Sequence, residues 1–252
     1  MNLLAFDTAT PATAVALVTG TARAELRHDP APGERPGHAA QLLPLASRLL
    51  DAAGLRFTDL DRIAVGRGPG TFTGLRIGVA TARALAQSTG ADLVGVSTLQ
   101  ALATTAKWSA KGSDPLSRGD ADSLRAAGRE GSDPFTVLAV LDARRGEAFV
   151  GGWRGDEQVV APAAVTPALL ARVAEAAAPP LLAVGDGAVR FRAVLEPCGA
   201  TVPADGSPLH RLSALAVADL AAGAPPAGRE GVTPEYLRLP DAEIALRERR
   251  AE

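Results

Sequence analysis

The sequence has a single cysteine, few aromatic residues and almost no net charge, and the first and last of these narrow the possible functions. Cys198 is the single cysteine, so no disulfide can form within the chain, and we expect a reducing compartment, the cytoplasm. Aromatic residues make up 4% of the chain, and 26 Lys and Arg nearly balance 28 Asp and Glu, giving a net charge of −2. The chain therefore has no overall basic field with which to hold nucleic acid or an anionic membrane.

Long hydrophobic runs are also absent. The longest uncharged run, Thr8 to Ala22, has 15 residues and contains Pro11, whereas a membrane-spanning helix needs roughly 18 or more. The first residues include no positive leader, and Asp7 lies within the first apolar run, which argues against a signal peptide. We expect no membrane segment.

The first half of the chain alternates short apolar runs with helical patterns. A meander of three strands is expected over residues 3–6, 13–18 and 22–27. Pro44 should weaken or kink the first of the helices that follow. Residues 109–134 are polar and glycine-rich, which predicts an exposed, mobile insertion. Helical spacing predicts helices over 38–53, 73–89 and 99–108, with strands over 63–65 and 93–96 between them.

The second half repeats the organisation of the first. LLAFDTATPATAVALV, around Asp7, and VLAVLDARRGEAFVGGW, around Asp142, each describe a strand, a polar turn and a returning strand. The repeat predicts two α/β subdomains of the ribonuclease H-like type, with mixed sheets flanked by helices. We place them at 1–98 and 99–223, with the tail 224–252 able to pack back on the first. In the second half we expect strands over 136–141, 147–153, 158–160 and 181–184, and helices over 167–177, 188–195 and 209–222.

One glycine loop and two aspartates are the candidates for nucleotide chemistry. GRGPGTFTG has neither the ending of a phosphate-binding P-loop nor the third glycine of a dinucleotide fingerprint, which favours a close-packing or partner-contact loop. Asp7 and Asp142 resemble the carboxylates that position magnesium or water in sugar kinases, but each can instead cap a tight turn, and we favour the cap. With Thr8 and Thr10 nearby, a weak nucleotide or phosphate contact at Asp7 stays open. The three histidines lack the spacing of helical zinc ligands.

Small residues recur every fourth position along the helix expected over 73–89. Gly74, Gly78, Ala82 and Ala86 form a smooth ridge that allows close approach of another element. The ridge can lie on the chain's own sheet, or it can meet a helix of another protein. The pattern alone does not separate the two interpretations.

Six segments together carry a family resemblance: AVGRGPGTFTGLRIGVATARALA, LLAFDTAT, HAAQLLPLASRLLDAAGL, LVGVSTLQALA, VLAVLDARRGEAF and PEYLR. They resemble the TsaB, or YeaZ, family over nearly the whole chain. The resemblance implies the fold of the actin-like ATPase superfamily. It also implies a non-catalytic scaffolding subunit. This subunit would work with a TsaD-like transferase and a TsaE-like ATPase to form threonylcarbamoyl-adenosine beside the anticodon of tRNAs. It would meet tRNA only through the complex.

The transferase of that system is a paralogue, and it carries a pair of histidines that bind metal in the segment equivalent to LVGVSTLQALA. Thr98 and Leu102 stand at the matching positions here. A leucine has no lone pair to donate, so that metal site cannot form and no catalytic residue or metal ligand is expected. No cofactor should be bound tightly, and ATP or ADP is expected at the complex interface only.

The resemblance also suggests where the transferase binds. We expect the helices over 38–53 and 73–89 to form half of a four-helix contact, and the same surface to make a homodimer when the partner is absent. An independent ATPase or sugar kinase of the same fold remains the alternative, and a metallopeptidase is remote. The expected interface residues are His38, Gln41, Leu42, Leu45, Leu49, Phe72, Thr73, Gly74, Leu75, Arg76, Gly78, Val79 and Ala82.

Overall fold

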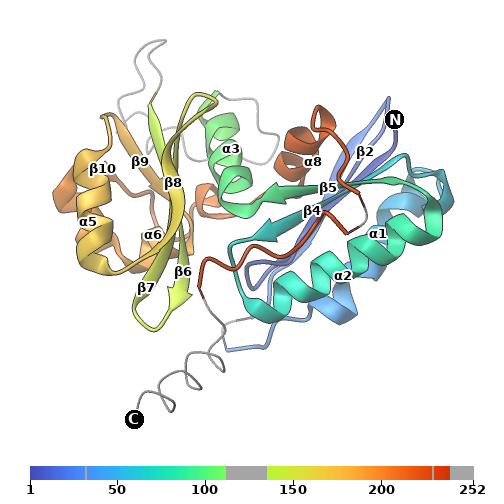
Figure 1. Cartoon of the computed structure of the whole chain (residues 1–252), viewed down its shortest axis with the longest axis horizontal. Helices are drawn as coiled ribbons and strands as arrows, with labels where there is room; N and C mark the ends of the chain where they lie inside the picture. The colour runs from blue at the N-terminus through green and yellow to red at the C-terminus, as the bar shows by residue number, and fades with distance from the viewer. Residues whose placement is uncertain (32, 112–134, 229, 239–252) are drawn as a thin grey trace.

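The structure, a computed structural model, describes residues 1–31, 33–111, 135–228 and 230–238. The expected insertion at 109–134 therefore lies almost entirely outside the described residues, as does the tail after residue 238. Two α/β lobes lie side by side (Figure 1). None of the helices in the described part of the chain is long and apolar enough to cross a membrane.

The first lobe is built on a five-stranded mixed sheet in the order β3-β2-β1-β4-β5. The first three strands are antiparallel, which confirms the expected meander, whereas β4 and β5 run parallel to β1. Leu4 and Phe6 point to one face of the sheet and Leu3 and Ala5 to the other, and all four are buried, so helices must cover both faces. The strands are β1 Leu3–Asp7, β2 Thr13–Val18, β3 Arg23–His28, β4 Arg62–Gly68 and β5 Asp92–Ser97.

Two helices cover the face that carries Leu4 and Phe6. They are α1, His38–Ala52, and α2, Phe72–Thr89, which lie next to each other along the lower right of Figure 1. The first helix continues through Pro44, at a position where the missing N–H costs one intrahelical bond. The second ends at Gly90, which adopts a left-handed conformation at φ 79°.

The second lobe repeats the first in topology. Its sheet has the order β10-β9-β6-β7-β8, and β6 pairs antiparallel with β7 and parallel with β9, just as β1 pairs with β2 and β4. The repeat predicted from the sequence is therefore confirmed. The elements are β6 Thr136–Arg144, β7 Glu147–Arg154, β8 Glu157–Val165, α5 Pro167–Ala176, β9 Leu181–Val184, α6 Asp186–Arg190, α7 Arg192–Leu195 and β10 Ala200–Thr201.

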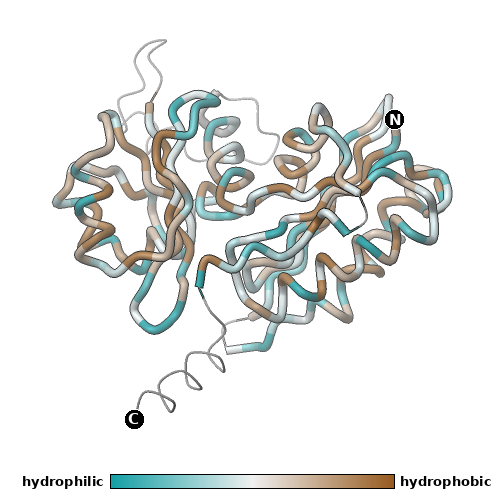
Figure 2. The backbone as a smooth tube through the Cα atoms, viewed as in Figure 1, coloured by the Kyte–Doolittle hydropathy of each residue, from teal (hydrophilic) through white to brown (hydrophobic). Residues whose placement is uncertain are grey.

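Two helices form the middle layer between the lobes. These are α3, Thr98–Lys111, and α8, Ala214–Ala222. Side chains of α3 and α8 share one core cluster with residues of both sheets, and the tube in Figure 2 shows hydrophobic segments in the strands of both lobes. The helix α8 packs on β1 and β2, so the boundary expected at residue 223 is wrong: the chain returns to the first lobe before α8.

Two helices expected in the second half are interrupted. The helix expected over 188–195 is divided at Phe191 into α6 and α7. The helix expected over 209–222 is shorter, because a 3-10 turn, Pro208–His210, comes first and Ser213 then caps α8 by accepting a hydrogen bond from the Leu215 N–H at 3.2 Å. The strand expected at 158–160 is longer than predicted, since β8 extends to Val165.

Residues 230–238, which we call the C-terminal strap, run back across the first lobe and over α2 (Figure 1). Val232 is 2% exposed in the core beneath α1 and α2. The Arg83 guanidinium donates to the carbonyl oxygens of Glu230 and Val232 at 2.9 Å, and the Glu235 N–H donates to the Arg67 carbonyl at 2.7 Å. At its end, the Arg238 guanidinium reaches the Ala143 carbonyl of the second lobe at 2.7 Å.

Candidate functional site

The small-residue ridge of α2 lies on the chain's own β1–β2 turn. A Cβ at Gly74 would lie 1.9 Å from the Thr8 carbonyl oxygen, and a Cβ at Gly78 would lie 2.4 Å from Thr8 Oγ1. The Thr8 hydroxyl donates to the Gly74 carbonyl at 2.7 Å. Of the two interpretations of the ridge, the structure supports packing within the chain, because a glycine Cα is all that fits at these distances.

This placement corrects most of the expected interface residues. Nine of the thirteen are buried within the single chain: His38, Leu42, Leu45, Leu49, Gly74, Leu75, Gly78, Val79 and Ala82. Their spacing along the sequence is that of the inner faces of α1 and α2, and these faces pack on the sheet. Gln41 and Phe72 are partly exposed, and Thr73 and Arg76 are exposed.

The outer face of the same two helices presents exposed residues, of which only Thr73 and Arg76 were expected at the interface from the sequence. Leu43 is 44% exposed, and Pro44 beside it is exposed as well. The first ten residues of α1 contain no Asp, Glu, Lys or Arg, and this lack of charge was the signal that could have identified the face. We define the outer helix face as the exposed residues Ala39, Ala40, Leu43, Pro44, Thr73, Arg76, Ala80 and Ala84.

Asp7, expected as a possible phosphate contact, is sealed inside the chain. Its Oδ1 accepts a hydrogen bond from the Ala9 N–H at 2.8 Å, and its Oδ2 accepts one from the Thr98 hydroxyl at 2.8 Å. Burial raises the pKa of this carboxyl, against the lowering effect of those hydrogen bonds. Asp7 therefore caps its turn, as favoured from the sequence, and neither it nor the buried Thr8 can reach a phosphate.

The second aspartate of the repeat plays the same local role. Asp142 Oδ1 accepts from the Arg144 N–H at 2.9 Å, closing the turn after β6, and the carboxylate also binds the Arg190 guanidinium at 2.8 Å. Both aspartates are therefore turn caps in the described structure.

Thr98 and Leu102 are both buried at the start of α3. The Thr98 hydroxyl is used by Asp7, and Leu102 contributes an apolar side chain to the space between the lobes. Within the described residues, no three His, Cys, Asp or Glu side chains lie close enough together to hold a metal ion.

A cavity of about 250 Å³ remains between the lobes, and Thr10 is the one residue of the expected phosphate contact that lines it. Two arginines, Arg27 and Arg211, line it, and Arg27 is held within the chain: its Nε lies 2.8 Å from the Asp29 carboxylate, and its Nη1 lies 2.6 Å from the Leu212 carbonyl oxygen. The carboxylate of Asp186, on the other wall, accepts the Asp142 N–H at 3.1 Å. Arg27 and Asp186, which both line the cavity, are therefore each hydrogen-bonded to other groups of the chain.

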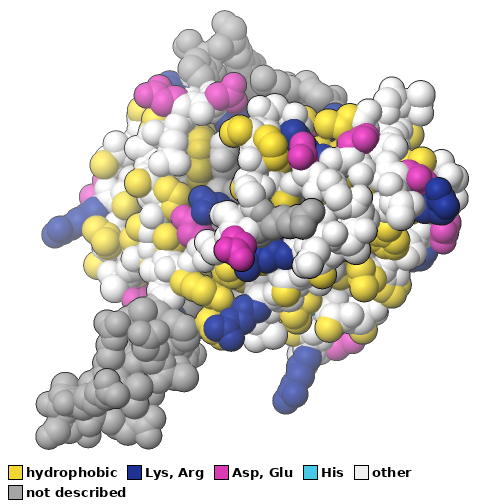
Figure 3. Space-filling view, turned by 45° about the vertical axis from the view of Figure 1, so that its right-hand side comes forward, with side chains coloured by type: hydrophobic (Ala, Val, Ile, Leu, Met, Phe, Trp, Pro, Cys, Tyr) yellow, Lys and Arg dark blue, Asp and Glu magenta, His cyan; other side chains and the backbone are white. Residues whose placement is uncertain are grey.

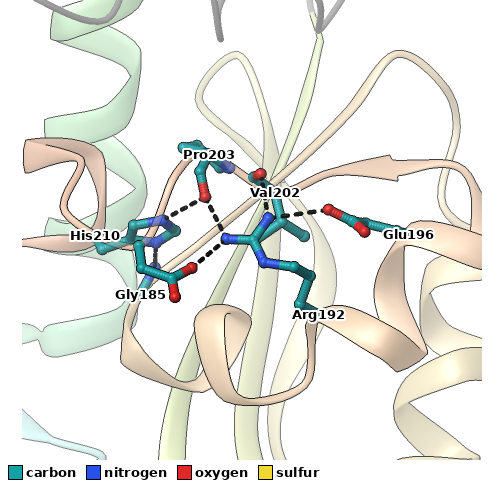
Figure 4. A network of polar contacts seen from close by, with 7 residues as sticks. Gly185, Arg192, Glu196, Val202, Pro203 and His210 are labelled. Atoms are coloured by element: carbon teal, nitrogen blue, oxygen red, sulfur yellow. Dashed lines mark hydrogen bonds and ion pairs between the residues drawn. The ribbon is translucent and has the colours of Figure 1, made fainter.

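Residues 202–210, of which His210 lines the cavity, are held in place by Arg192 and His210 (Figure 4). Arg192 donates to the carbonyl oxygens of Val202 at 2.7 Å and Pro203 at 2.6 Å, and it pairs with Glu196 and Asp205. His210 Nδ1 accepts from the Gly185 N–H at 3.1 Å. Since that nitrogen is the acceptor, Nε2 carries the proton and donates to the Pro203 carbonyl at 3.1 Å, and burial lowers the pKa of the ring.

Comparison with known proteins finds a transferase family, proteins named TsaB and an uncharacterized protein. A family described as "TsaD: tRNA N6-adenosine threonylcarbamoyltransferase" matches residues 34–118. The tRNA threonylcarbamoyladenosine biosynthesis protein TsaB of Escherichia coli is 35% identical over 158 residues, which cover 62% of this chain and 57% of that protein. The Bacillus subtilis protein of the same name is 27% identical over 96% of both chains. An uncharacterized protein of Mycobacterium tuberculosis is 31% identical over 96% of this chain and 93% of its own length.

Solved structures agree with these relatives. YeaZ from Pseudomonas aeruginosa superposes with a TM-score of 0.69 at 28% identity, covering 94% of this chain and 99% of that one. The overall architecture, with two lobes of the same topology, is therefore shared with that protein.

Proposed function

Because the chain belongs to the TsaB (YeaZ) family, we propose that it is the accessory subunit of the complex that forms threonylcarbamoyl-adenosine in tRNA. Its partner would be a TsaD-like transferase, with a TsaE-like ATPase as a third component, and tRNA would be met only through that complex. In this proposal the chain works in the cytoplasm, carries out no transferase, peptidase or steady ATPase reaction itself, and has ATP or ADP near it only at the complex interface.

The outer helix face is the observation that carries this proposal. Only Arg48, Asp51, Arg76 and Arg83 are charged in the 33 residues that α1 and α2 span together (15 and 18). Hydrophobic side chains gather along the lower right of Figure 3, where α2 lies. An exposed face that is this poor in charge is typical of a protein interface. The same surface would form a homodimer when the transferase is absent.

The interior of the molecule supports an accessory role. Asp7 and Thr8 form hydrogen bonds that fix the β1–β2 turn and α2, and Arg27, one of the arginines that line the cavity between the lobes, is paired with Asp29. An independent kinase would need these groups free for phosphate and magnesium. We therefore favour the accessory subunit over the alternative ATPase or sugar kinase.

Leu43→Arg tests the interface directly, because it places a charge in the centre of the uncharged half of α1. Leu169→Arg, on α5 of the second lobe, is the matched control, since Leu43 and Leu169 are 44% and 45% exposed. Complex formation between the full chain and the transferase of the same organism is measured by size-exclusion chromatography with light scattering. The complex, and any homodimer, should be lost with Leu43→Arg and kept with Leu169→Arg. Equal binding by both variants would refute the interface.

A further inference from the structure

The C-terminal strap and α2 together hold one exposed arginine in a fixed position. The Arg76 guanidinium carbon lies 3.9 Å from the centre of the Phe72 ring. The Tyr236 ring lies 5.1 Å from the Phe72 ring, and Arg76 Nε lies 3.2 Å from the Tyr236 hydroxyl oxygen and donates to it. Stacking and the hydrogen bond both act on the guanidinium plane, so its orientation is set before any partner arrives.

The position of Tyr236 is itself well defined, because the strap is anchored on either side of it. Glu235 donates its N–H to the Arg67 carbonyl at 2.7 Å and pairs with the Arg67 guanidinium at 3.5 Å. Arg238 donates to the Ala143 carbonyl at 2.7 Å on the far side. Tyr236, 41% exposed between these anchors, is the group that aligns Arg76.

The remaining donors of Arg76 are the N–H groups of its two Nη atoms. Among the described residues, neither of its Nη groups has a hydrogen-bond partner. Resting on the proposed function, we infer that Arg76 is a preorganised receptor for a carboxylate of the transferase, and that Tyr236 is its positioning residue. A planar guanidinium with two parallel donors fits a carboxylate in bidentate geometry.

A carboxylate suits this place better than an RNA phosphate. Binding to RNA through phosphates requires several basic residues acting together, whereas Arg48 and Arg76 are the exposed basic residues of α1 and α2, and Arg83 is bound to the C-terminal strap. A single arginine surrounded by apolar residues, stacked on an aromatic ring, is instead the composition of a protein interface in which arginine and tyrosine dominate the binding energy. The transferase should therefore present an aspartate or glutamate opposite the first turn of α2.

The test is the affinity of the full chain for the transferase, measured by isothermal titration calorimetry in the absence of tRNA. Arg76→Ala should weaken binding about 10-fold or more, because it removes a charge-assisted pair within an interface. Arg76→Lys should lose most of the same affinity, since an ammonium cannot bind a carboxylate in a fork. Tyr236→Phe, which keeps the ring and removes the hydroxyl, should weaken binding by a smaller factor. Arg172→Ala, an exposed arginine of α5, is the matched control.

The outcomes separate this inference from the function on which it rests. Leu43→Arg, on α1, tests the outer helix face without changing α2 or a neighbour of Arg76 in the sequence. If Leu43→Arg abolishes binding and Arg76→Ala leaves it unchanged, the carboxylate receptor is refuted and the accessory role stands. If wild-type protein does not bind the transferase, the proposed function itself fails. If Arg76→Ala weakens only the affinity of the assembled complex for tRNA, Arg76 contacts phosphate and the inference is overturned.

Discussion

The Thr98 hydroxyl donates a 2.8 Å hydrogen bond to Oδ2 of Asp7, joining two residues that are 91 positions apart in the chain. The bond links the end of β1 to the first turn of α3, which is the helix between the two lobes. Gly66 makes room for it, because a Cβ there would lie 1.7 Å from Asp7 Oδ2. The carboxylate of Asp7 therefore forms an internal polar contact and not a ligand site. This contact positions α3 in the middle layer between the lobes.

The burial of Asp7 makes the stability of the fold depend on pH, because it outweighs the hydrogen bonds from Ala9 and Thr98. Since burial raises the pKa of Asp7 in the folded protein above its unfolded value of about 3.9, the folded state holds this proton more strongly, and the free energy of unfolding falls as the pH rises through the folded pKa. Asp7→Asn should remove this loss of stability. Its free energy of unfolding should exceed that of wild type at pH 8, and the difference should become smaller in acid. Urea unfolding at several pH values measures this.

Asp7→Ala is the control for that prediction. It leaves the Ala9 N–H and the Thr98 hydroxyl without their acceptor, so it should destabilise the protein by about 1–3 kcal/mol at pH 8. If Asp7→Asn is as unstable as Asp7→Ala at that pH, the charge of Asp7 stabilises the fold and the assigned effect of burial is wrong.

His38 should give the opposite dependence on pH. Its Nδ1 lies 2.9 Å from the Thr13 hydroxyl oxygen, and burial, with a smaller effect of His28, lowers the pKa of the ring. A lowered pKa means that the folded state resists protonation, so stability is lost as the pH falls below the unfolded value of about 6.5. His38→Asn, which keeps a group able to bond Thr13, should reduce the slope of unfolding free energy between pH 6.5 and 5, roughly the range in which a free histidine titrates.

A residual slope in His38→Asn is expected, because burial also lowers the pKa of His210. The double variant with His210→Asn should be flatter still. Slopes that match wild type in the single variant would show that His38 does not titrate in this range.

Gly74 should tolerate substitution least among the glycines of α2. Gly74→Ala would place a Cβ 1.9 Å from the Thr8 carbonyl oxygen, which is backbone and cannot rotate away. We expect a loss of about 3 kcal/mol or more, at the upper end of the cost of overpacking. Gly206→Ala is the control, since nothing lies within 4 Å of a Cβ there. A bulky residue at Gly78 should likewise unfold the chain rather than separate it from a partner. A melting temperature unchanged by Gly74→Ala would contradict the packing of α2 on the turn.

Helices α1 and α2 show which features could be predicted from the sequence and which could not. The periodicity of leucine and alanine placed α1 and α2 within a residue or two of their bounds, because burial on a sheet imposes that spacing. Which surface the Gly74 and Gly78 ridge meets depends on Thr8, which is far away in the chain and contacts it only after folding. The spacing of small residues is the same for either neighbour, so the interface was assigned to the inner faces of the helices.

Long-range polar contacts account for the other differences. The placement of α8 on the first lobe is accompanied by hydrogen bonds from the Ser213 hydroxyl and the Leu215 N–H to the Glu25 carboxylate, and by an ion pair of 2.7 Å between Arg23 and Asp219. None of these pairings has a local sequence signature. The duplicated turns at Asp7 and Asp142 were predictable, since an Asx cap is formed with residues two positions away.

Arg192 tests whether the second lobe and the outer helix face are energetically separate. Arg192→Ala removes bonds to the carbonyl oxygens of Val202 and Pro203 and to two carboxylates, so residues 202–210 lose their main anchor. We expect a loss of about 1–3 kcal/mol in stability, seen as faster hydrogen exchange in that loop. Affinity for the transferase should stay at the wild-type value, because none of these contacts involves α1 or α2. A matching loss of affinity would mean that the partner also contacts the second lobe, and the interface would then have to extend beyond the outer helix face.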